Sequence, residues 1–140
     1  APTAIAWSEK NRSPLVRVPA ARGEATRVEL RLPDPSCNPY LALAVMLRAG
    51  LDGVVQELDP GPPVNKNIYK MSHRERRHLR IDDLPATLSE ALDEFEKSEL
   101  VRDALGEHIF EHFLAAKRGE WDEYTRHVSP WERDRYLSVY

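Results

Sequence analysis

The chain has 140 residues, of which 41% are hydrophobic and 31% are charged, and its formal net charge is -3. This length corresponds to one domain with a modest core and excludes a multidomain machine. The charge excludes a disordered acidic tail and a globally basic nucleic-acid-binding protein, so we expect no direct nucleic-acid partner. No apolar run reaches the roughly 20 residues that span a bilayer, and the single cysteine, Cys37, cannot form an internal disulfide. We therefore expect a cytoplasmic protein without a membrane partner.

The small net charge averages two regions of opposite sign. Residues 10–31 hold six basic and two acidic residues, a local net charge of +4. Residues 82–111 hold ten acidic and two basic residues, a local net charge of -8. Any function that depends on positive charge must therefore be local.

Three short segments near the amino end combine β-branched or aromatic residues with alternating polarity, which is typical of strands. They are residues 3–7, 15–18 and 27–32. Gly23, between the second and third segments, predicts a turn, because glycine adopts positive φ without steric cost.

The third predicted strand places Arg27, Glu29 and Arg31 on one face, because side chains alternate across a strand. Arg12 and Arg17 belong to the adjacent strand or loop, so four arginines can converge around one acid. Guanidinium groups at this density repel one another unless a phosphate or carboxylate is present, and an acid among them can hold a divalent cation. The alternative is a surface ladder of ion pairs, each worth about 0.2 to 1 kcal/mol.

The middle of the chain predicts one long helix and a stiff connector. Asn38 and Pro39 form a plausible N-cap and first helical residue, and the helix should run to about Asp52. Residues 40–47 are apolar on nearly every side, so we expect a core helix that is buried on most of its circumference. The proline-rich residues 59–63 cannot form helix or central strand.

The last part of the chain predicts helices. Residues 87–90 match a capping box ahead of a second helix, and a third helix should end near Gly119. A second capping box at residues 129–132 opens a short aromatic tail. The expected fold class is α+β, with short antiparallel strands packed on a buried helix, followed by a mainly helical C-terminal half. The expected segments are a strand region (1–35), the core helix (36–58), proline-rich and arginine-rich loops (59–83), helices (84–128) and the tail (129–140).

Two further patterns suggest sites of lower specificity. His108 and His112 match the H-x-x-E-H pattern of inverted zinc peptidases and share a helix face, but such short matches are common by chance, and an amphipathic helix explains them better. The four arginines within residues 74–80 suggest a phosphate or nucleic-acid patch, although a solvated loop is the better interpretation.

Several long motifs in order resemble the carboxyl-terminal part of the catalytic domain of a type I glutamine synthetase, over essentially the whole chain. The motifs are residues 6–8, 11–19, 26–35, 38–44, 49–53 and 66–69. Residues 84–92, 104–108 and 131–133 resemble the feedback-inhibited bacterial subgroup. The resemblance implies ATP-dependent ligation of ammonia to glutamate through a γ-glutamyl phosphate intermediate, with Mg²⁺ or Mn²⁺ as cofactor.

The resemblance also implies roles for the arginine cluster. Arg12 would be catalytic and would contact ATP and glutamate, while Arg17 and Arg27 would bind ATP. Glu29 would ligate the metal, and Arg31 would bind glutamate. The family further implies a cytoplasmic dodecamer of two stacked hexameric rings, in which the tail would be a strap inserted into a facing subunit, and contacts with transcriptional repressors.

Some expectations concern what lies outside these motifs. Tyr69 aligns with a tyrosine that is adenylylated in another subgroup, but the residues after it differ, so we do not expect that modification. The chain starts at Ala1 without methionine, and the family's other metal ligands and its ammonia site have no match, so we expect a fragment that is inactive alone. Two alternatives stay open: a non-catalytic anion-binding or regulatory interaction module, and a γ-glutamyl-amine ligase of the same family.

Overall fold

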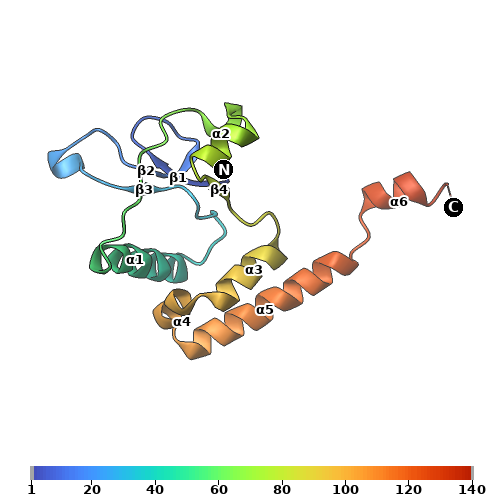
Figure 1. Ribbon diagram of the computed structural model, residues 1–140. Helices are drawn as coiled ribbons and strands as arrows, with labels where there is room; N and C mark the ends of the chain where they lie inside the picture. The colour runs from blue at the N-terminus through green and yellow to red at the C-terminus, as the bar shows by residue number, and fades with distance from the viewer. Residues whose placement is uncertain (1, 140) are drawn as a thin grey trace. The chain divides into compact units, whose positions relative to one another are not determined.

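The computed structural model describes residues 2–139, which form two compact units, Ala1–Pro85 and Ala86–Tyr140 (Figure 1). The first unit contains all the strands of the described chain and the second contains helices only. The predicted α+β class, with a mainly helical C-terminal half, is therefore confirmed.

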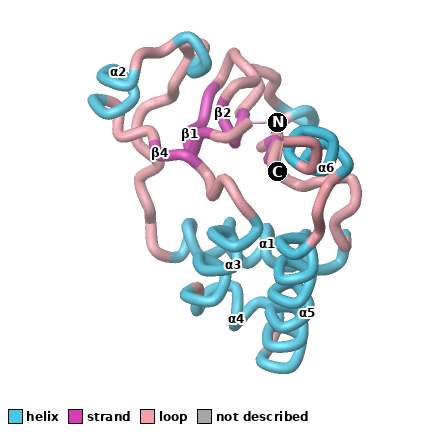
Figure 2. The backbone as a smooth tube through the Cα atoms, turned by 90° about the vertical axis from the view of Figure 1, so that its right-hand side faces the viewer, coloured by secondary structure: helices cyan, strands magenta, loops and turns pink. Residues whose placement is uncertain are grey.

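A small four-stranded sheet organises the first unit, with the strand order β3-β2-β1-β4. The strands are β1 (Ala4–Ser8), β2 (Pro14–Arg17), β3 (Glu29–Leu30) and β4 (Asp82–Asp83). Figure 2 shows β2, β1 and β4 side by side. Because β4 comes from a segment more than 60 residues after β2, the sheet joins distant parts of the chain.

The central pair of the sheet differs from the expected antiparallel arrangement. β1 and β2 run parallel, with Ala4 opposite Pro14 and Ser8 opposite Arg17. Only the outer pairs, β1 with β4 and β2 with β3, are antiparallel. The parallel pairing requires the short connection 9–13 to lead the chain back to the start of β1, and side-chain hydrogen bonds in that connection stabilise this path.

The hydrophobic core of the first unit is small. Ala4, Ile68 and Ile81 are buried together, and partly buried apolar residues pack around them. Gly23 adopts a φ of +70° at the start of a 3-10 turn, η1 (Gly23–Ala25), as its position in a tight turn predicted.

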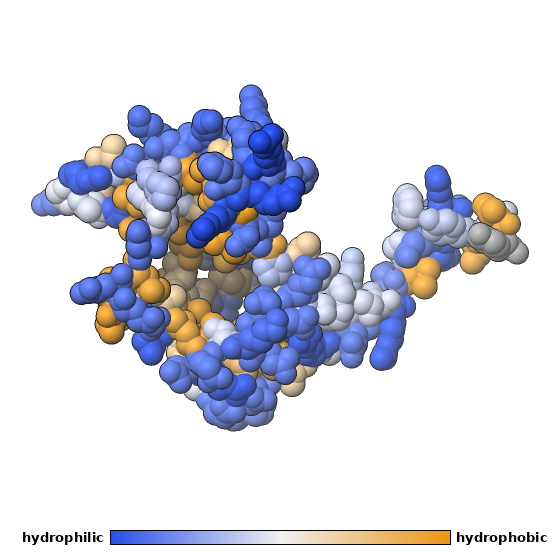
Figure 3. All heavy atoms as spheres, viewed as in Figure 1, coloured by the Kyte–Doolittle hydropathy of each residue, from blue (hydrophilic) through white to orange (hydrophobic). Residues whose placement is uncertain are grey.

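The long helix α1 (Pro39–Val55) begins as predicted but is not buried. Its N-cap is Asn38, whose side chain accepts hydrogen bonds from the backbone N–H groups of Tyr40 and Leu41. No residue of α1 is buried, and Leu47 is 65% exposed. Figure 3 shows apolar residues at the surface over α1. A helix that is apolar all round needs packing partners on several sides, and the small core of the first unit is formed by other segments.

The segment 59–83 contains more regular structure than the loops that the sequence predicted. It forms a 3-10 turn, η2 (Ile68–Lys70), and a short helix, α2 (His73–His78), before β4. Ser72 and Glu75 form a capping box for α2, a signal that the sequence contained and that the arginine-rich composition obscured.

The second unit is a small helical assembly. Its helices are α3 (Leu88–Lys97), α4 (Glu99–Leu105), α5 (Glu107–Arg126) and α6 (Pro130–Tyr136). The side chain of Thr87 caps α3 as predicted. α4 was not expected, and α5 continues past Gly119 because one exposed glycine costs a helix only about 1 kcal/mol.

Phe110 on α5 is the centre of the second unit's core. It is fully buried with Leu92 and Leu114, and its ring stacks on Phe95 with 4.6 Å between centroids. The guanidinium of Arg102 lies 4.0 Å from the centroid of the same ring. Helices α3, α4 and α5 therefore pack together through one aromatic side chain.

The predicted capping box at the tail is confirmed. The side chain of Ser129 accepts from the backbone N–H of Glu132, and the Glu132 carboxylate accepts from the backbone N–H of Ser129. Trp131 and Leu137 are 63% and 79% exposed, so the aromatic tail is not part of the core. Within residues 2–139, no helix has both the length and the apolar character needed to span a membrane.

Replacing Phe110 with alanine should destabilise the second unit by about 3 to 5 kcal/mol, because it removes a buried ring and leaves a cavity. Peptide-resolved hydrogen exchange of α3 to α5 measures this loss. Ile109→Ala is the matched control, since Ile109 lies next to Phe110 on the same helix but is 42% exposed. Equal losses for the two variants would contradict the assignment of Phe110 as the core centre.

Candidate functional site

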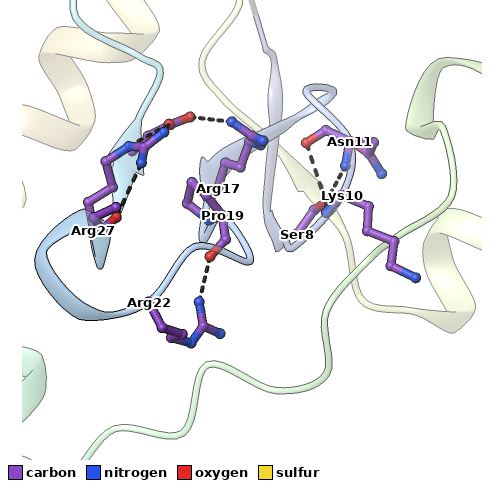
Figure 4. Close-up of polar contacts among 9 residues, drawn as sticks. Ser8, Lys10, Asn11, Arg17, Pro19, Arg22 and Arg27 are labelled. Atoms are coloured by element: carbon purple, nitrogen blue, oxygen red, sulfur yellow. Dashed lines mark hydrogen bonds and ion pairs between the residues drawn. The ribbon is translucent and has the colours of Figure 1, made fainter.

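One carboxylate between two guanidinium groups is the main feature of the β2 and β3 pair. The strand register places Arg17 directly opposite Glu29. Arg17 Nη1 donates to Glu29 Oε2 at 2.9 Å, and Arg27 Nη2 lies 2.7 Å from Glu29 Oε1. Figure 4 shows Arg17 and Arg27 directed towards the same carboxylate. The predicted convergence of these three residues is therefore confirmed in geometry.

The two arginines also change the acidity of Glu29. The hydrogen bond from Arg17, followed by that from Arg27, lowers the pKa of Glu29 below its ordinary value, because both favour the charged carboxylate. The side chains of Arg17 and Glu29 are 22% and 29% exposed. The carboxylate therefore stays ionised at neutral pH and partly neutralises the two cations.

Two guanidinium nitrogens at this site lack an acceptor. Arg17 Nε and Arg31 Nη1 are buried, and neither has a hydrogen-bond partner within the described chain. The backbone N–H of Arg31 donates to Leu15 O at 3.0 Å, which holds the residue beside β2. A buried donor without an acceptor costs on the order of 1–3 kcal/mol. With three arginines and one carboxylate, the site has the chemistry to bind an anion such as phosphate or carboxylate.

Arg12 lies apart from this cluster. It occupies the connection between β1 and β2, its side chain is exposed, and it makes no hydrogen bond or ion pair with residues 2–139. The structure does not bring Arg12 into contact with Glu29. Of the four predicted arginines, Arg17 and Arg27 bind this carboxylate, whereas Arg31 is held beside β2 through its backbone.

The residues on either side of Arg12 are ones that the sequence analysis did not single out. Asn11 and Ser13 bind each other and the distant segment 64–68 through side-chain hydrogen bonds. Asparagine and serine two residues apart commonly bind nearby backbone, which is the signal that was available.

The structure gives less support to the other sites that the sequence patterns suggested. The rings of His108 and His112 lie 4.1 Å apart, and His112 Nδ1 lies 2.7 Å from the His108 carbonyl oxygen. Among residues 2–139, no group of three or more histidine, cysteine, aspartate or glutamate side chains is arranged to hold a metal. Of the four arginines in 74–80, Arg76 forms an ion pair with Asp83 beside α2.

Glu29 has the chemistry of a single metal ligand. Both its oxygens accept hydrogen bonds from arginine, yet a carboxylate offers about four lone-pair sites, so an oxygen can still bind a hard cation. Glu29 therefore fits a role as one ligand of Mg²⁺ or Mn²⁺, with the other ligands supplied elsewhere.

The fold and the arginine cluster define a protein unit with guanidinium donors suited to an anion, at a sheet whose strands come from distant segments. The sequence profile described as "Glutamine synthetase, catalytic domain" matches residues 1–136. The chain therefore belongs to the glutamine synthetase family and corresponds to part of its catalytic domain.

Individual relatives agree with this assignment. The chain is 59% identical over 140 residues to a glutamine synthetase of Thermus thermophilus and 58% identical over 139 residues to one of Methanosarcina mazei. It spans 31% of the length of each, and these matches cover 100% and 99% of the chain. A solved structure described as "GmaS/ADP complex-Conformation 1" superposes with a TM-score of 0.84 at 36% identity, covering 99% of this chain and 30% of that one.

The carboxyl of Glu29 should titrate below the ordinary range of glutamate. The contribution of its ion pairs to stability is then fully present above the unfolded-state pKa and is lost as the pH falls through the lower folded-state pKa. NMR titration of the Glu29 side-chain carboxyl carbon measures the midpoint. Arg17→Gln should raise that midpoint, whereas Arg22→Gln, which removes an arginine bound only to backbone carbonyls, should not. An unchanged midpoint in Arg17→Gln would contradict the assigned cause.

Proposed function

We propose that this chain supplies part of the ATP, metal and glutamate site of a glutamine synthetase, which joins ammonia to glutamate through a γ-glutamyl phosphate. The observation that carries the proposal is the Arg17, Glu29 and Arg27 cluster, with its unpaired buried donors, in a chain of this family. Both substrates that must be held are anions, and the cluster has the donors that such groups require.

The proposal gives each residue of the cluster the role that the family resemblance implies, and the geometry of the cluster is compatible with these roles. Arg17 and Arg27 bind ATP phosphates, and their shared contact with Glu29 orients the two guanidinium groups before substrate binds. Glu29 ligates Mg²⁺ or Mn²⁺, which when bound neutralises phosphate charge. Arg31 binds the glutamate carboxylate through its unpaired Nη1.

Arg12 is the catalytic residue of the proposal and also contacts ATP and glutamate. Its side chain has no internal counter-charge within the described chain, so its full positive charge is available to the transferring phosphoryl group. A cation that meets developing negative charge stabilises the transition state more than the ground state.

The wider setting of the proposal is a cytoplasmic dodecamer of two stacked hexameric rings. The exposed Trp131 and Leu137 of the tail support a strap that inserts into a facing subunit, since large exposed apolar side chains commonly mark interaction surfaces. Contacts with transcriptional repressors are part of the same proposal.

A γ-glutamyl-amine ligase is the second candidate within the family. The relatives that are 59% and 58% identical to the chain are named glutamine synthetase, which favours ammonia as the amine. A non-catalytic anion-binding module predicts instead that no ligase activity depends on Glu29.

The 140-residue chain alone should form no glutamine, because Glu29 is the only carboxylate at the cluster among residues 2–139 and a multi-ion site needs several oxygen ligands. The measurement is glutamine formation from glutamate, ammonia and ATP with Mg²⁺ or Mn²⁺. Detectable turnover by the purified chain would overturn this expectation.

A chimera tests the proposed function directly. The chain replaces the matching 140 residues of the Thermus thermophilus relative, and the chimera should form glutamine. Glu29→Gln should lower kcat at least 100-fold, because it removes a metal ligand and the charge between two arginines. Arg22→Gln in the same chimera is the control and should keep normal activity. Full activity of Glu29→Gln would favour the non-catalytic module.

A further inference from the structure

The side-chain amide of Asn11 is used completely. Asn11 Nδ2 donates to the carbonyl oxygens of Val64 and Lys66, each at 3.0 Å. Asn11 Oδ1 accepts from the backbone N–H and the hydroxyl of Ser13 at 2.9 and 2.8 Å. Two donors and two lone pairs are thus all engaged, which a carboxylate or a hydroxyl cannot reproduce.

Two buried serines extend this network on either side. The hydroxyl of Ser8 accepts from the backbone N–H groups of Lys10 and Asn11 at 3.1 and 2.9 Å, as Figure 4 shows. The hydroxyl of Ser13 accepts from the backbone N–H of Ile68 at 3.2 Å. Ser8 is 0% and Ser13 6% exposed, so these bonds are shielded from water.

Arg12 is the one residue between the two anchored ones. Asn11 and Ser13 hold the backbone on both sides of it, while its own side chain is exposed and makes no contact of this kind within residues 2–139. Fixing the backbone of a residue costs about 1–2 kcal/mol of conformational entropy. Here that cost is met during folding, before any substrate binds.

We propose that Asn11 is a positioning residue for Arg12 and that the segment 64–68 is the anchor against which it acts. This inference rests on the proposed function, because it assigns to Asn11 the task of placing the arginine that meets the phosphoryl group. Asn11 acts through Arg12 in this proposal, because its own amide is fully engaged within the chain. A displacement of about 1 Å at a catalytic group can cost 100-fold in rate, so loss of the amide should reduce turnover.

The test is a double-mutant cycle in the chimera with the Thermus thermophilus relative. Asn11→Ala should lower kcat for glutamine formation 10-fold to 100-fold, as should Asn11→Asp, which lacks the two donors to the segment 64–68. In an Arg12→Ala background, Asn11→Ala should cause less than a 2-fold further loss, because a positioning residue has nothing left to position. Lys10→Ala, in the same connection, is the matched control and should leave kcat unchanged.

The hydrogen bonds of Asn11 and Ser13 to the segment 64–68 form a clamp on the backbone around Arg12. Hydrogen exchange on the same variants measures the stability of this clamp separately from activity. Asn11→Ala should speed the exchange of the Ile68 and Ser13 amides at least 10-fold, while the amides of α3 to α5 keep their protection. Ser13→Ala is the second variant and covers the case in which Asn11→Ala does not fold. It removes the hydroxyl that donates to Asn11 Oδ1 and accepts from the backbone N–H of Ile68, and it should show the same dependence on Arg12.

The outcomes separate this inference from the proposed function. Additive losses, in which the Asn11 or Ser13 variant lowers kcat equally with and without Arg12, would mean that these residues do not act through Arg12. That result would overturn the positioning role while the synthetase assignment stands. A folded chimera that forms no glutamine would overturn the proposed function and the role of Arg12 with it. Unchanged exchange at Ile68 in Asn11→Ala would overturn the clamp whatever the activity.

Discussion

Several like charges can be held close together only if a counter-charge lies between them, and Glu29 meets this condition in the first unit. Its two oxygens accept from Arg17 and Arg27, so two guanidinium groups that would repel each other share one partner. Arg31 extends the positive charge, and no carboxylate within residues 2–139 pairs with it. The cluster is therefore organised but not neutral, which is the state of a site prepared for an anion.

The parts of the fold that the sequence predicted are those with local signals. The caps at Asn38, Thr87 and Ser129 each start a helix where expected, because a capping side chain binds backbone only a few residues away. The parallel pairing of β1 with β2 and the strand β4 were not predicted, since both depend on where distant segments lie. The burial of α1 was predicted wrongly, because an apolar sequence shows what a helix can bury but not what is present to cover it.

For the candidate site too, the features with local sequence signals were predicted and those that depend on distant segments were not. Alternation along one strand correctly placed Glu29 and Arg27 on one face, and the cross-strand register with Arg17 completes the group. The separation of Arg12 from that group was not predictable, because its position depends on bonds between Asn11 and carbonyl groups more than 50 residues away. Local patterns therefore identified the charged residues, and the tertiary contacts decide which of them act together.

Arg17 and Arg27 on one hand, and Arg12 on the other, are thus held by two different kinds of interaction. Arg17 and Arg27 are oriented by a charge, so their geometry depends on the ionisation of Glu29. Arg12 is placed through neutral amide and hydroxyl groups that hold the backbone on either side of it, so no partner within the described part of the chain reduces its charge. A residue that must orient a substrate tolerates partial neutralisation, whereas one that must stabilise developing negative charge does not. Among residues 2–139 no carboxylate pairs with Arg12, and hydrogen bonds to the segment 64–68 supply the order that an ion pair would otherwise give.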